Sequence, residues 1–405
     1  MKLLDLPQFI SSITGRKESL LKTDLENNHQ LLSERIDGKS VLVIGGAGTI
    51  GSNYIKALLK FKPSKLYVVD INENGLTELV RDVRSSDDLN IPNEFITYPI
   101  NFSDTVFEKI LAQEVRFDII ANFAAHKHVR SEKDHFSIEA MVDNNVLKAR
   151  RLLDVLLINP PNHFFCVSTD KAANPVNVMG ASKKLMEEVI LAYSDKMSIT
   201  TARFANVAFS NGSLLFGFLE RLTKRQPLSS PLDIKRYFVS PQESGELCLL
   251  ACMLGESGDI FFPKLNPKDD LKTFADIATR LLAEYGLEPD FCQSENEARQ
   301  KAAQFKKTPS LKYPVLYFSS DTSGEKPYEE FFVGNETIDW QKFKALGVIK
   351  NSPKRTMEDI NSIFDNLYVI FRDGNINKQA IVNAIKDIIP NFKHIEKGKG
   401  LDQKM

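Results

Sequence analysis

A glycine-rich turn between a predicted strand and a predicted helix places the strongest constraint on this fold. Residues 41–44 form a short apolar run that ends at the sequence GGAGTIG of residues 45–51, and apolar residues then recur at helical spacing. Glycines at 45, 48 and 51 permit a tight turn, close approach of a phosphate to backbone N–H groups, and tight packing of helix on strand. Asp70 ends the next predicted strand, 19 positions after Gly51, where a carboxylate can bind ribose hydroxyls. The combination predicts a dinucleotide-binding unit.

Strand and helix patterns continue to alternate through the first half of the chain. The next predicted strands cover residues 65–70, 95–100, 117–123, 163–167 and 199–204, with predicted helices at 74–84, 104–113, 142–157 and 179–193. Repeated strand–helix units predict an α/β fold with a parallel, doubly wound sheet of the Rossmann type. Beyond residue 206, prolines interrupt this pattern, as expected of a smaller C-terminal substrate-binding lobe.

Four segments are therefore expected along the chain. They are an N-terminal helical extension at 1–37, an NAD(P)-binding Rossmann domain at 38–205, a substrate-binding lobe at 206–350 that partly returns to the Rossmann sheet, and C-terminal helices with a polar tail at 351–405. Spaced apolar residues in the extension predict short amphipathic helices that pack on a neighbouring surface. Helices at both termini favour a homo-oligomer.

Composition excludes several classes of partner. The chain has 52 basic and 53 acidic residues, so nothing in its net charge of −1 suggests a surface for nucleic acid or acidic membranes. No stretch reaches the ~18–20 apolar residues of a membrane helix, and the N-terminus lacks the apolar core of a secretory signal. The four cysteines lack paired C-x-x-C spacing. We therefore expect a cytoplasmic protein with buried free thiols, no metal site and no membrane insertion.

The segment that follows the second predicted strand bears on which dinucleotide binds. Asp70 would repel a 2′-phosphate, and residues 70–73 offer no arginine to receive one, so NAD is favoured over NADP. Ala124 and Ala125 follow another apolar strand, where small side chains suit backbone that passes beside the cofactor. A plain strand end explains these two alanines equally well.

Polar residues follow the predicted strand 163–167, at the edge where ligands bind in open α/β sheets. They are Ser168, Thr169, Asp170 and Lys171. Met179 and Lys183 lie one helical turn apart on the next predicted helix. In the extended short-chain dehydrogenases this pair is Tyr-x-x-x-Lys, with the tyrosine as the acid–base group and the lysine on the nicotinamide ribose. This chain keeps the lysine and has methionine in place of the tyrosine.

Over residues 38–332 the sequence resembles a branch of that family, the UDP-N-acetylglucosamine 4,6-dehydratases of bacterial surface-polysaccharide biosynthesis. The matching parts are the glycine loop, AAHKHV at 124–129, Asn145, the block STDKAANPVNVMGASK at 168–183, RFANV at 203–207, and GEK at 324–326 before Glu329 and Glu330. The Thr-Asp-Lys block is the specific part of the match. Ile44, Asn101 and Lys148 depart from the threonine, aspartate and glycine that are usual there.

The resemblance implies a bound NAD that takes hydride from C4 of the sugar and returns it to C6, with elimination of water across C5 and C6 in between. It implies Asp170 as the acid for the departing C6 hydroxyl and Lys171 as the base at C5. Thr169 would hydrogen-bond the C4 hydroxyl. Met179 cannot transfer a proton, so the group that takes the C4 hydroxyl proton stays open among Lys183, Lys171 and a water chain.

The remaining expected site residues bind cofactor or substrate. Expected cofactor contacts are Gly45, Gly48, Thr49, Ile50, Gly51, Asp70, Asn101, Phe102, Ala124, Ala125, Lys127, Asn145, Ser168 and, on the nicotinamide ribose, Lys183. Expected substrate contacts are Lys127, Arg203, Asn206, Glu325 and, for the diphosphate, Arg236. A buried arginine–carboxylate pair is the alternative for Arg203, and a surface ion pair with Lys326 is the alternative for Glu325.

These expectations combine into a predicted activity. The chain would convert UDP-N-acetylglucosamine, or a close UDP-N-acetylhexosamine, to a 4-keto-6-deoxy sugar nucleotide for glycan assembly. One alternative is a UDP-sugar 4-epimerase, whose chemistry normally uses the tyrosine that Met179 replaces. A second alternative is a non-catalytic NAD-binding regulator, for which the adjacent Asp170 and Lys171 would have no purpose.

Overall fold

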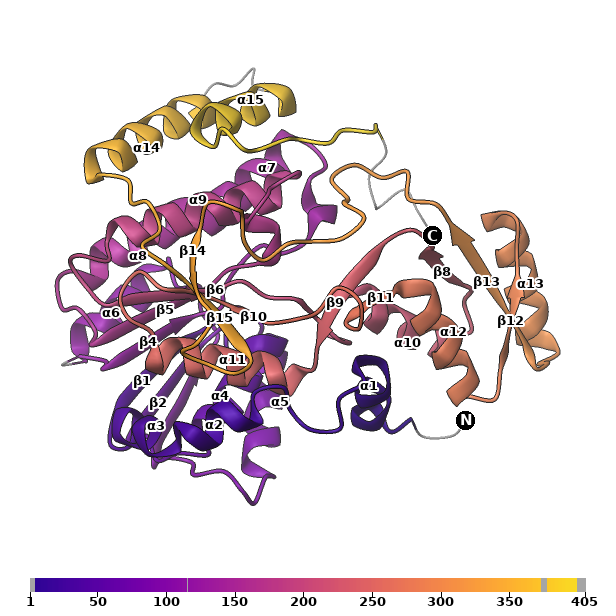
Figure 1. Cartoon of the computed structure of the whole chain (residues 1–405), viewed down its shortest axis with the longest axis horizontal. Coiled ribbons are helices and arrows are strands. Elements are labelled where there is room, and N and C mark those ends of the chain that lie inside the picture. The colour runs from indigo at the N-terminus through magenta and orange to yellow at the C-terminus, as the bar shows by residue number, and fades with distance from the viewer. Residues whose placement is uncertain (1–3, 115, 373–376, 399–405) are drawn as a thin grey trace.

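The computed structural model describes residues 4–114, 116–372 and 377–398, and its centre is one nine-stranded sheet (Figure 1). The strand order is β14-β15-β10-β6-β5-β4-β1-β2-β3. The strands are β1 (Ser40–Ile44), β2 (Lys65–Val69), β3 (Glu94–Tyr98), β4 (Ile119–Asn122), β5 (His163–Val167), β6 (Ile199–Ala202), β10 (Ile260–Pro263), β14 (Thr337–Asp339) and β15 (Leu346–Lys350). Neighbours from β3 to β10 pair in parallel, and β15 and β14 add antiparallel pairs. The predicted doubly wound α/β sheet is confirmed.

The direction of the strand order changes beside β1, which lies between β2 and β4. Ile44, the last residue of β1, pairs with Val69 of β2 and with Asn122 of β4. The carboxyl ends of these three strands therefore meet at one edge of the sheet. Ligands of open α/β sheets bind at such a switch point, and the glycine loop, Asp70 and Ala124 all follow it directly.

Helices cover both faces of the sheet, which explains why its strands are continuous apolar runs rather than alternating ones. One face packs against α6 (Thr105–Gln113), α7 (His135–Val142), α8 (Lys148–Leu156) and α9 (Val178–Ala192), with α14 (Met357–Arg372) and α15 (Lys378–Ile388) outside them (Figure 1). The other face packs against α3 (His29–Ile36), α4 (Thr49–Leu58), α5 (Glu73–Arg84) and α11 (Pro241–Leu254). Gly245 of α11 lies directly against α4, because a Cβ there would be 2.2 Å from the carbonyl carbon of Asn53.

A smaller lobe extends to the right of the sheet in Figure 1. It holds two three-stranded sheets, in the orders β11-β9-β7 and β12-β13-β8. Its elements are β7 (Asn206–Val207), α10 (Leu214–Thr223), β8 (Leu228–Pro231), β9 (Lys235–Val239), β11 (Leu271–Thr273), α12 (Phe274–Glu284), β12 (Glu288–Phe291), α13 (Glu295–Lys307) and β13 (Lys312–Phe318). Within the expected lobe 206–350, the strands β10, β14 and β15 belong to the large sheet instead.

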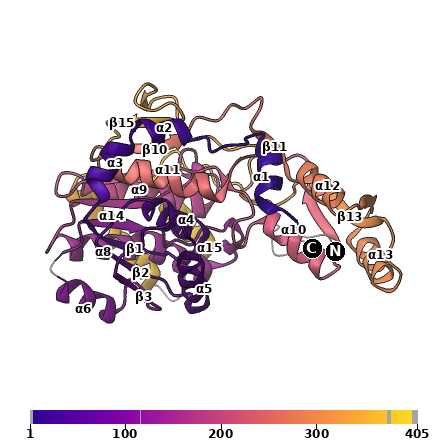
Figure 2. The same cartoon turned by 90° about the horizontal axis from the view of Figure 1, so that it is seen from below.

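The N-terminal extension joins the two parts of the molecule (Figure 2). Helix α1 (Leu6–Thr14) buries Phe9, Ile10 and Ile13 in the core of the lobe, whereas α3, which follows α2 (Lys22–Asn27), packs on the large sheet. Between them, Arg16 donates hydrogen bonds to Glu243 of α11 at 2.8 Å and to Asp270 of the lobe at 3.1 Å. The terminal helices thus pack on their own chain, and the expected homo-oligomer stays a prediction.

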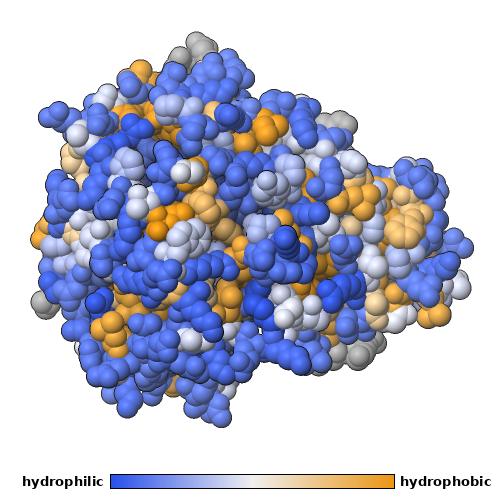
Figure 3. Space-filling view, viewed as in Figure 1, coloured by the Kyte–Doolittle hydropathy of each residue, from blue (hydrophilic) through white to orange (hydrophobic). Residues whose placement is uncertain are grey.

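The four cysteines agree with the expectation of buried free thiols. On the face seen in Figure 3, apolar residues form small patches among hydrophilic ones. Among the described residues, no helix combines the length and apolar character needed to cross a membrane. Cys166, Cys248, Cys252 and Cys292 are all buried and free.

Candidate active site

Two glycines of the loop leave no room for a side chain, and one of them also has a left-handed backbone. Gly45 has a φ of 76°, and a Cβ there would lie 2.6 Å from the backbone nitrogen of Ala124. A Cβ on Gly51 would lie 2.4 Å from the carbonyl oxygen of Gly45. Gly48 is the N-cap of α4, and no side chain caps the free N–H groups of the first turn. Uncapped N–H groups at a helix N-terminus suit a phosphate, so these residues fit the diphosphate of a dinucleotide.

Asp70 lies beside this loop at the switch point of the sheet. Its Oδ2 accepts the N–H of Ala47 and its Oδ1 accepts the N–H of Asn72, both at 2.9 Å. The carboxylate is therefore fixed next to the glycine loop, as expected for ribose binding. Thr49 and Ile50 begin α4, and the Oγ1 of Thr49 accepts the N–H of Asn211 at 3.0 Å.

The expected cofactor residues that follow β3 and β4 contact other parts of the protein. The Oδ1 of Asn101 accepts the N–H of Ser103 at 3.0 Å, and Phe102 is buried in the core between sheet and helices. Ala124 and Ala125 follow β4 and are partly buried. Ala124 donates its N–H to the Oδ1 of Asn122 at 3.0 Å. Ala124 thus lies against the glycine loop, as its contact with the Gly45 position shows.

Asp170 and Lys171 form a close pair directly after β5. The Nζ of Lys171 lies 3.0 Å from the Oδ1 of Asp170, which also accepts the hydroxyl of Thr169 at 2.8 Å. The side chain of Asp170 is 3% exposed and that of Lys171 is 15% exposed, so a ligand can reach the lysine while water has little access to the carboxylate. The structure thus brings together the three expected residues of the Thr-Asp-Lys block.

Helix α9 places its two expected residues inside the protein. Met179 is 3% exposed and belongs to the core between α9 and the sheet. The Nζ of Lys183 donates to the carbonyl oxygen of Val167 at 2.6 Å, at the end of β5. Burial lowers the pKa of Lys183, because the charged form loses its hydration there. The amino group thus lies at the end of β5, just before the segment that carries Thr169 and Asp170.

A buried network of charges lies next to this strand. Arg203 is fully buried and its guanidinium bonds to Glu187, Glu336 and the carbonyl oxygen of Phe331. Burial alone would raise the pKa of Glu187, but the adjacent guanidinium holds it below its ordinary value. Glu187 also accepts the hydroxyl of Ser168 at 2.6 Å. Arg203 and Glu187 therefore form a buried arginine–carboxylate pair. This is the alternative to a substrate contact that the sequence left open for Arg203.

Asn145 holds the segment after β4 against α9. It lies in a π-helical turn, η2 (Asp143–Leu147), a distortion that often occurs at functional sites. Its Oδ1 accepts the N–H of His126 at 2.8 Å, and its Nδ2 donates to the carbonyl oxygen of His126 and to the hydroxyl of Ser182. Lys127, the residue after His126, has an exposed side chain that a ligand can reach.

The expected substrate residues of the lobe differ in how far their polar atoms are already bonded. The Nδ2 of Asn206 is buried and has no hydrogen-bond partner in the described part of the chain, so a donor is left for a ligand. Arg236 donates to the carbonyl oxygens of Lys235 and Lys326, both at 2.9 Å, and so holds the loop that follows Gly324. Glu325 accepts the hydroxyl of Thr322 at 2.6 Å rather than pairing with Lys326.

Residues 393–398, which the sequence indicated only as part of a polar tail, join two loops of the site. Ile395 donates its N–H to the carbonyl oxygen of Val176 at 2.9 Å and accepts the N–H of Gly324 at 2.9 Å. His394 lies 2.5 Å from Glu132, which also accepts the N–H of Val178 at the start of α9. No local pattern in the sequence points to these long-range partners.

Glu132, His394 and Glu396 also bring three possible metal ligands together. The ammonium of Lys378 lies 2.7 Å from Glu396 and 3.5 Å from Glu132. A lysine therefore already supplies the positive charge at this cluster.

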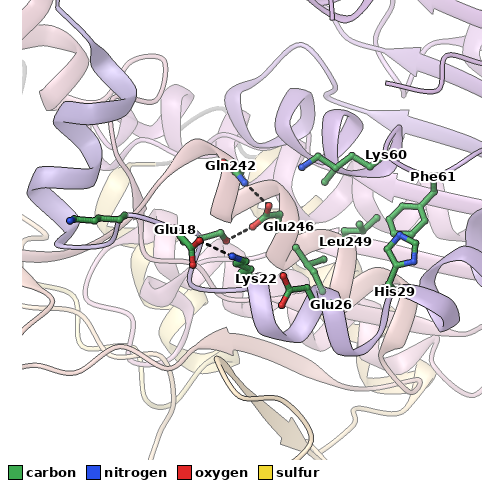
Figure 4. A pocket seen from close by; sticks show the side chains of 13 residues that line it. Glu18, Lys22, Glu26, His29, Lys60, Phe61, Gln242, Glu246 and Leu249 are labelled. Atoms are coloured by element: carbon green, nitrogen blue, oxygen red, sulfur yellow. Dashed lines mark hydrogen bonds and ion pairs between the residues drawn. The ribbon is translucent and has the colours of Figure 1, made fainter. Parts of the chain in front are cut away.

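A pocket of about 490 Å³ lies elsewhere, between the N-terminal extension and the helices α4 and α11 (Figure 4). Its walls include Leu25, Ala57, Phe61 and Leu249, with a Lys22–Glu18 ion pair at the rim. Ala57 and Phe61 lie at the C-terminal end of α4, whereas the glycine loop lies at its N-terminal end. The pocket is therefore not part of the candidate active site.

Comparisons with known proteins identify several relatives of this chain. An uncharacterized membrane protein of Methanocaldococcus jannaschii is 30% identical over 91% of this chain and 97% of its own length. The capsular polysaccharide biosynthesis protein CapD of Staphylococcus aureus is 26% identical over 81% of this chain, which spans only 51% of that protein. The solved structure of a double mutant of the dTDP-glucose 4,6-dehydratase DesIV from Streptomyces venezuelae, with NAD bound, covers 73% of this chain and 88% of its own at 19% identity and a TM-score of 0.55. At that identity the likeness shows the fold alone.

Two further relatives, matched over a smaller part of this chain, carry different activities in their names. A UDP-N-acetylglucosamine 4,6-dehydratase (inverting) of Campylobacter jejuni is 24% identical over 56% of this chain and 68% of its own length. A UDP-glucose 4-epimerase of Rickettsia bellii is 29% identical over 58% of this chain and 69% of its own length. The family model described as "Polysaccharide biosynthesis protein" matches residues 41–351, and the chain therefore belongs to that family.

Proposed function

We propose that this protein is an NAD-dependent UDP-N-acetylhexosamine 4,6-dehydratase, with UDP-N-acetylglucosamine as its substrate class. The observation that carries the proposal is the pair of buried Asp170 and partly exposed Lys171 at the carboxyl end of β5. An elimination needs an acid and a base on neighbouring atoms, and this pair supplies both. NAD fits the glycine loop and Asp70, and it supplies reversible hydride acceptance when bound.

The two residues act on adjacent carbons of the sugar. Lys171 removes the proton at C5, and Asp170 protonates the C6 hydroxyl as it departs as water. The 3.0 Å contact between them allows the proton of an ammonium–carboxylate pair to move to Asp170, which leaves a neutral amine and a protonated acid. These are the states that the elimination requires.

The second candidate function is a UDP-sugar 4-epimerase, which the relative of that name favours. Epimerisation needs no acid and base for loss of water, and Met179 occupies the position of the tyrosine that such enzymes normally use. Asp170 and Lys171 would then be an ion pair without a chemical task. A dehydratase reaction gives both Asp170 and Lys171 a chemical task, whereas an epimerase reaction gives them none.

Incubation of the protein with NAD and UDP-N-acetylglucosamine in deuterated water separates these functions by mass spectrometry. A dehydratase gives a product that has lost water and carries deuterium from solvent at C5. An epimerase gives neither change, and an inactive NAD-binding protein returns the sugar unaltered. Recovery of substrate or epimer alone would refute the proposal.

A further inference from the structure

Glu329 is a buried carboxylate beside Lys171 that has no role in the chemistry described above. It lies in the segment between β13 and β14, and its side chain is 2% exposed. Its Oε1 lies 3.8 Å from the Nζ of Lys171 and 3.8 Å from the Nη2 of Arg236. Lys326 lies 3.9 Å from its Oε2. These distances are those of ion pairs, and all exceed the length of a hydrogen bond.

The Oε2 of Glu329 is buried and has no hydrogen-bond partner among the described residues. Buried carboxylate oxygens normally accept hydrogen bonds, because leaving them unpaired is costly. The neighbouring cations of Lys171, Arg236 and Lys326 balance the negative charge of Glu329, but they are too far from its Oε2 to donate a hydrogen bond to it. An oxygen in this state indicates a donor that arrives with a ligand. A sugar hydroxyl is such a donor, whereas a phosphate offers only acceptors and negative charge.

Lys171 lies between two carboxylates, Asp170 at 3.0 Å and Glu329 at 3.8 Å. In the proposed reaction Lys171 acts at C5, and Asp170 acts at the C6 hydroxyl on one side of that carbon. The hydroxyl on the other side of C5 is that of C4. A second carboxylate beside Lys171 is thus suited to the C4 hydroxyl, whose proton acceptor Met179 cannot be.

We propose that Glu329 is the base that accepts the C4 hydroxyl proton, and that Lys171 passes this proton on to Asp170; the inference rests on the proposed dehydratase function. At C4, the C–H bond breaks with its electron pair transferred to NAD, and the O–H proton goes to the Oε2 of Glu329. Lys171 then takes the C5 proton while Asp170 protonates the departing C6 hydroxyl. Hydride returns to C6, and Lys171 returns a proton to C5.

This sequence leaves Glu329 protonated and Asp170 ionised, with Lys171 neutral between them. Transfer of the proton from Glu329 through Lys171 to Asp170 restores all three starting states. The C4 hydroxyl proton thereby replaces the proton that leaves in water, so atoms and charges balance over each turnover without any further acid or base.

The test uses the NAD-loaded full chain with Glu329→Gln, and Glu330→Gln as the matched control. Glu330 is the neighbouring residue, but its side chain is 48% exposed and bonds to Asn174. Cofactor reduction by UDP-N-acetylglucosamine in a single turnover is followed by absorbance, and binding of the same sugar nucleotide by calorimetry. Loss of a general base slows its step about 100-fold or more. We expect this loss in Glu329→Gln, with sugar-nucleotide affinity within about threefold of the parent, and no change in Glu330→Gln.

Two further variants make the result specific. Asp170→Asn should still reduce the cofactor and exchange deuterium into C5, while water loss fails. Glu329→Asp keeps a carboxylate with a shorter reach, so its cofactor reduction should fall between those of the parent and Glu329→Gln. If Glu329→Gln does not fold, Glu329→Asp alone provides the test. Cofactor reduction at the parental rate in Glu329→Asp would then overturn the inference.

The inference is overturned if Glu329→Gln reduces the cofactor at a rate within about tenfold of the parent, well short of the loss expected for a general base. It is also overturned if that variant loses sugar-nucleotide binding to the same extent as cofactor reduction. Failure of the parent protein to release water from UDP-N-acetylglucosamine would instead refute the proposed function. The two failures are therefore distinguishable.

Discussion

Replacement of Arg203 by methionine should destabilise the protein strongly, because this guanidinium neutralises buried carboxylates. It is fully buried, and it makes five hydrogen bonds of 2.9–3.1 Å to Glu187, Glu336 and the carbonyl oxygen of Phe331. Breaking a buried pair by removing one partner costs about 3–5 kcal/mol, since the remaining charge is left uncompensated. Glu187 would be that charge, because its side chain is 0% exposed. The loss is a large part of a typical stability of about 5–15 kcal/mol.

Urea denaturation followed by circular dichroism measures this loss. Arg299→Met is the matched control, because Arg299 pairs with Glu295 on the surface, at 58% and 32% exposure. An exposed pair contributes at most about 1 kcal/mol, so the control should change the unfolding free energy little. Adding Glu187→Gln to Arg203→Met should recover part of the lost stability, because the buried charge is removed as well.

The outcome also decides between two interpretations of Arg203. A stabilising role predicts a large drop in the unfolding free energy whether or not UDP-N-acetylglucosamine is present. Destabilisation below about 1 kcal/mol, together with lost sugar-nucleotide binding, would refute the reasoning and favour a direct substrate contact. Because Arg203 bonds to Phe331 and Glu336, the same variant should also loosen the segment that carries Glu329.

Further predictions follow from other contacts. Lys171→Ala should abolish water loss yet leave NAD affinity unchanged by calorimetry; near-parental turnover would exclude it as the base. Asp170→Asn should slow water loss by about 100-fold or more in a discontinuous mass-spectrometric assay. Gly51→Ala should weaken NAD binding, because its Cβ would lie 2.4 Å from the carbonyl oxygen of Gly45. Gly217→Ala should bind NAD normally, because a Cβ there would meet no atom of another described segment within 4 Å. Burial lowers the pKa of His163 from 6.5 to about 4, so on acidification the unfolded chain binds a proton at this residue before the folded chain does. The free energy of unfolding therefore decreases as the pH is lowered below 6.5. Between pH 7 and pH 5, His163 should account for about 2 kcal/mol of the decrease in the free energy of unfolding measured by urea denaturation. His163→Asn should show a decrease that is smaller by this amount.

Local patterns in the sequence were sufficient to predict the large sheet and the edge where the site lies. The glycine loop, Asp70 and the Thr-Asp-Lys block each follow a strand directly, so their places depend on strand order and little else. Parallel strands with helical crossovers leave few alternative orders. This explains why Asp170 and Lys171 form the expected pair.

Contacts between distant segments could not be predicted in this way. Glu329 and His394 lie in segments without regular structure, and their partners Lys171 and Glu132 are far away in the chain. Helical spacing placed Lys183 on the same side of α9 as Met179, but it does not reveal that its ammonium bonds to the carbonyl oxygen of Val167. Such choices depend on the packing of neighbouring elements, which periodicity does not encode.

Transfer of the C4 hydrogen within one sugar tests the proposed function most directly. The protein is incubated with NAD and UDP-N-acetylglucosamine that carries deuterium at C4, and the product is examined by nuclear magnetic resonance and mass spectrometry. A 4,6-dehydratase should release water and place the deuterium on the C6 methyl group of a 4-keto sugar nucleotide. Deuterium that stays at C4, in recovered substrate or in its C4 epimer, would contradict the proposed function.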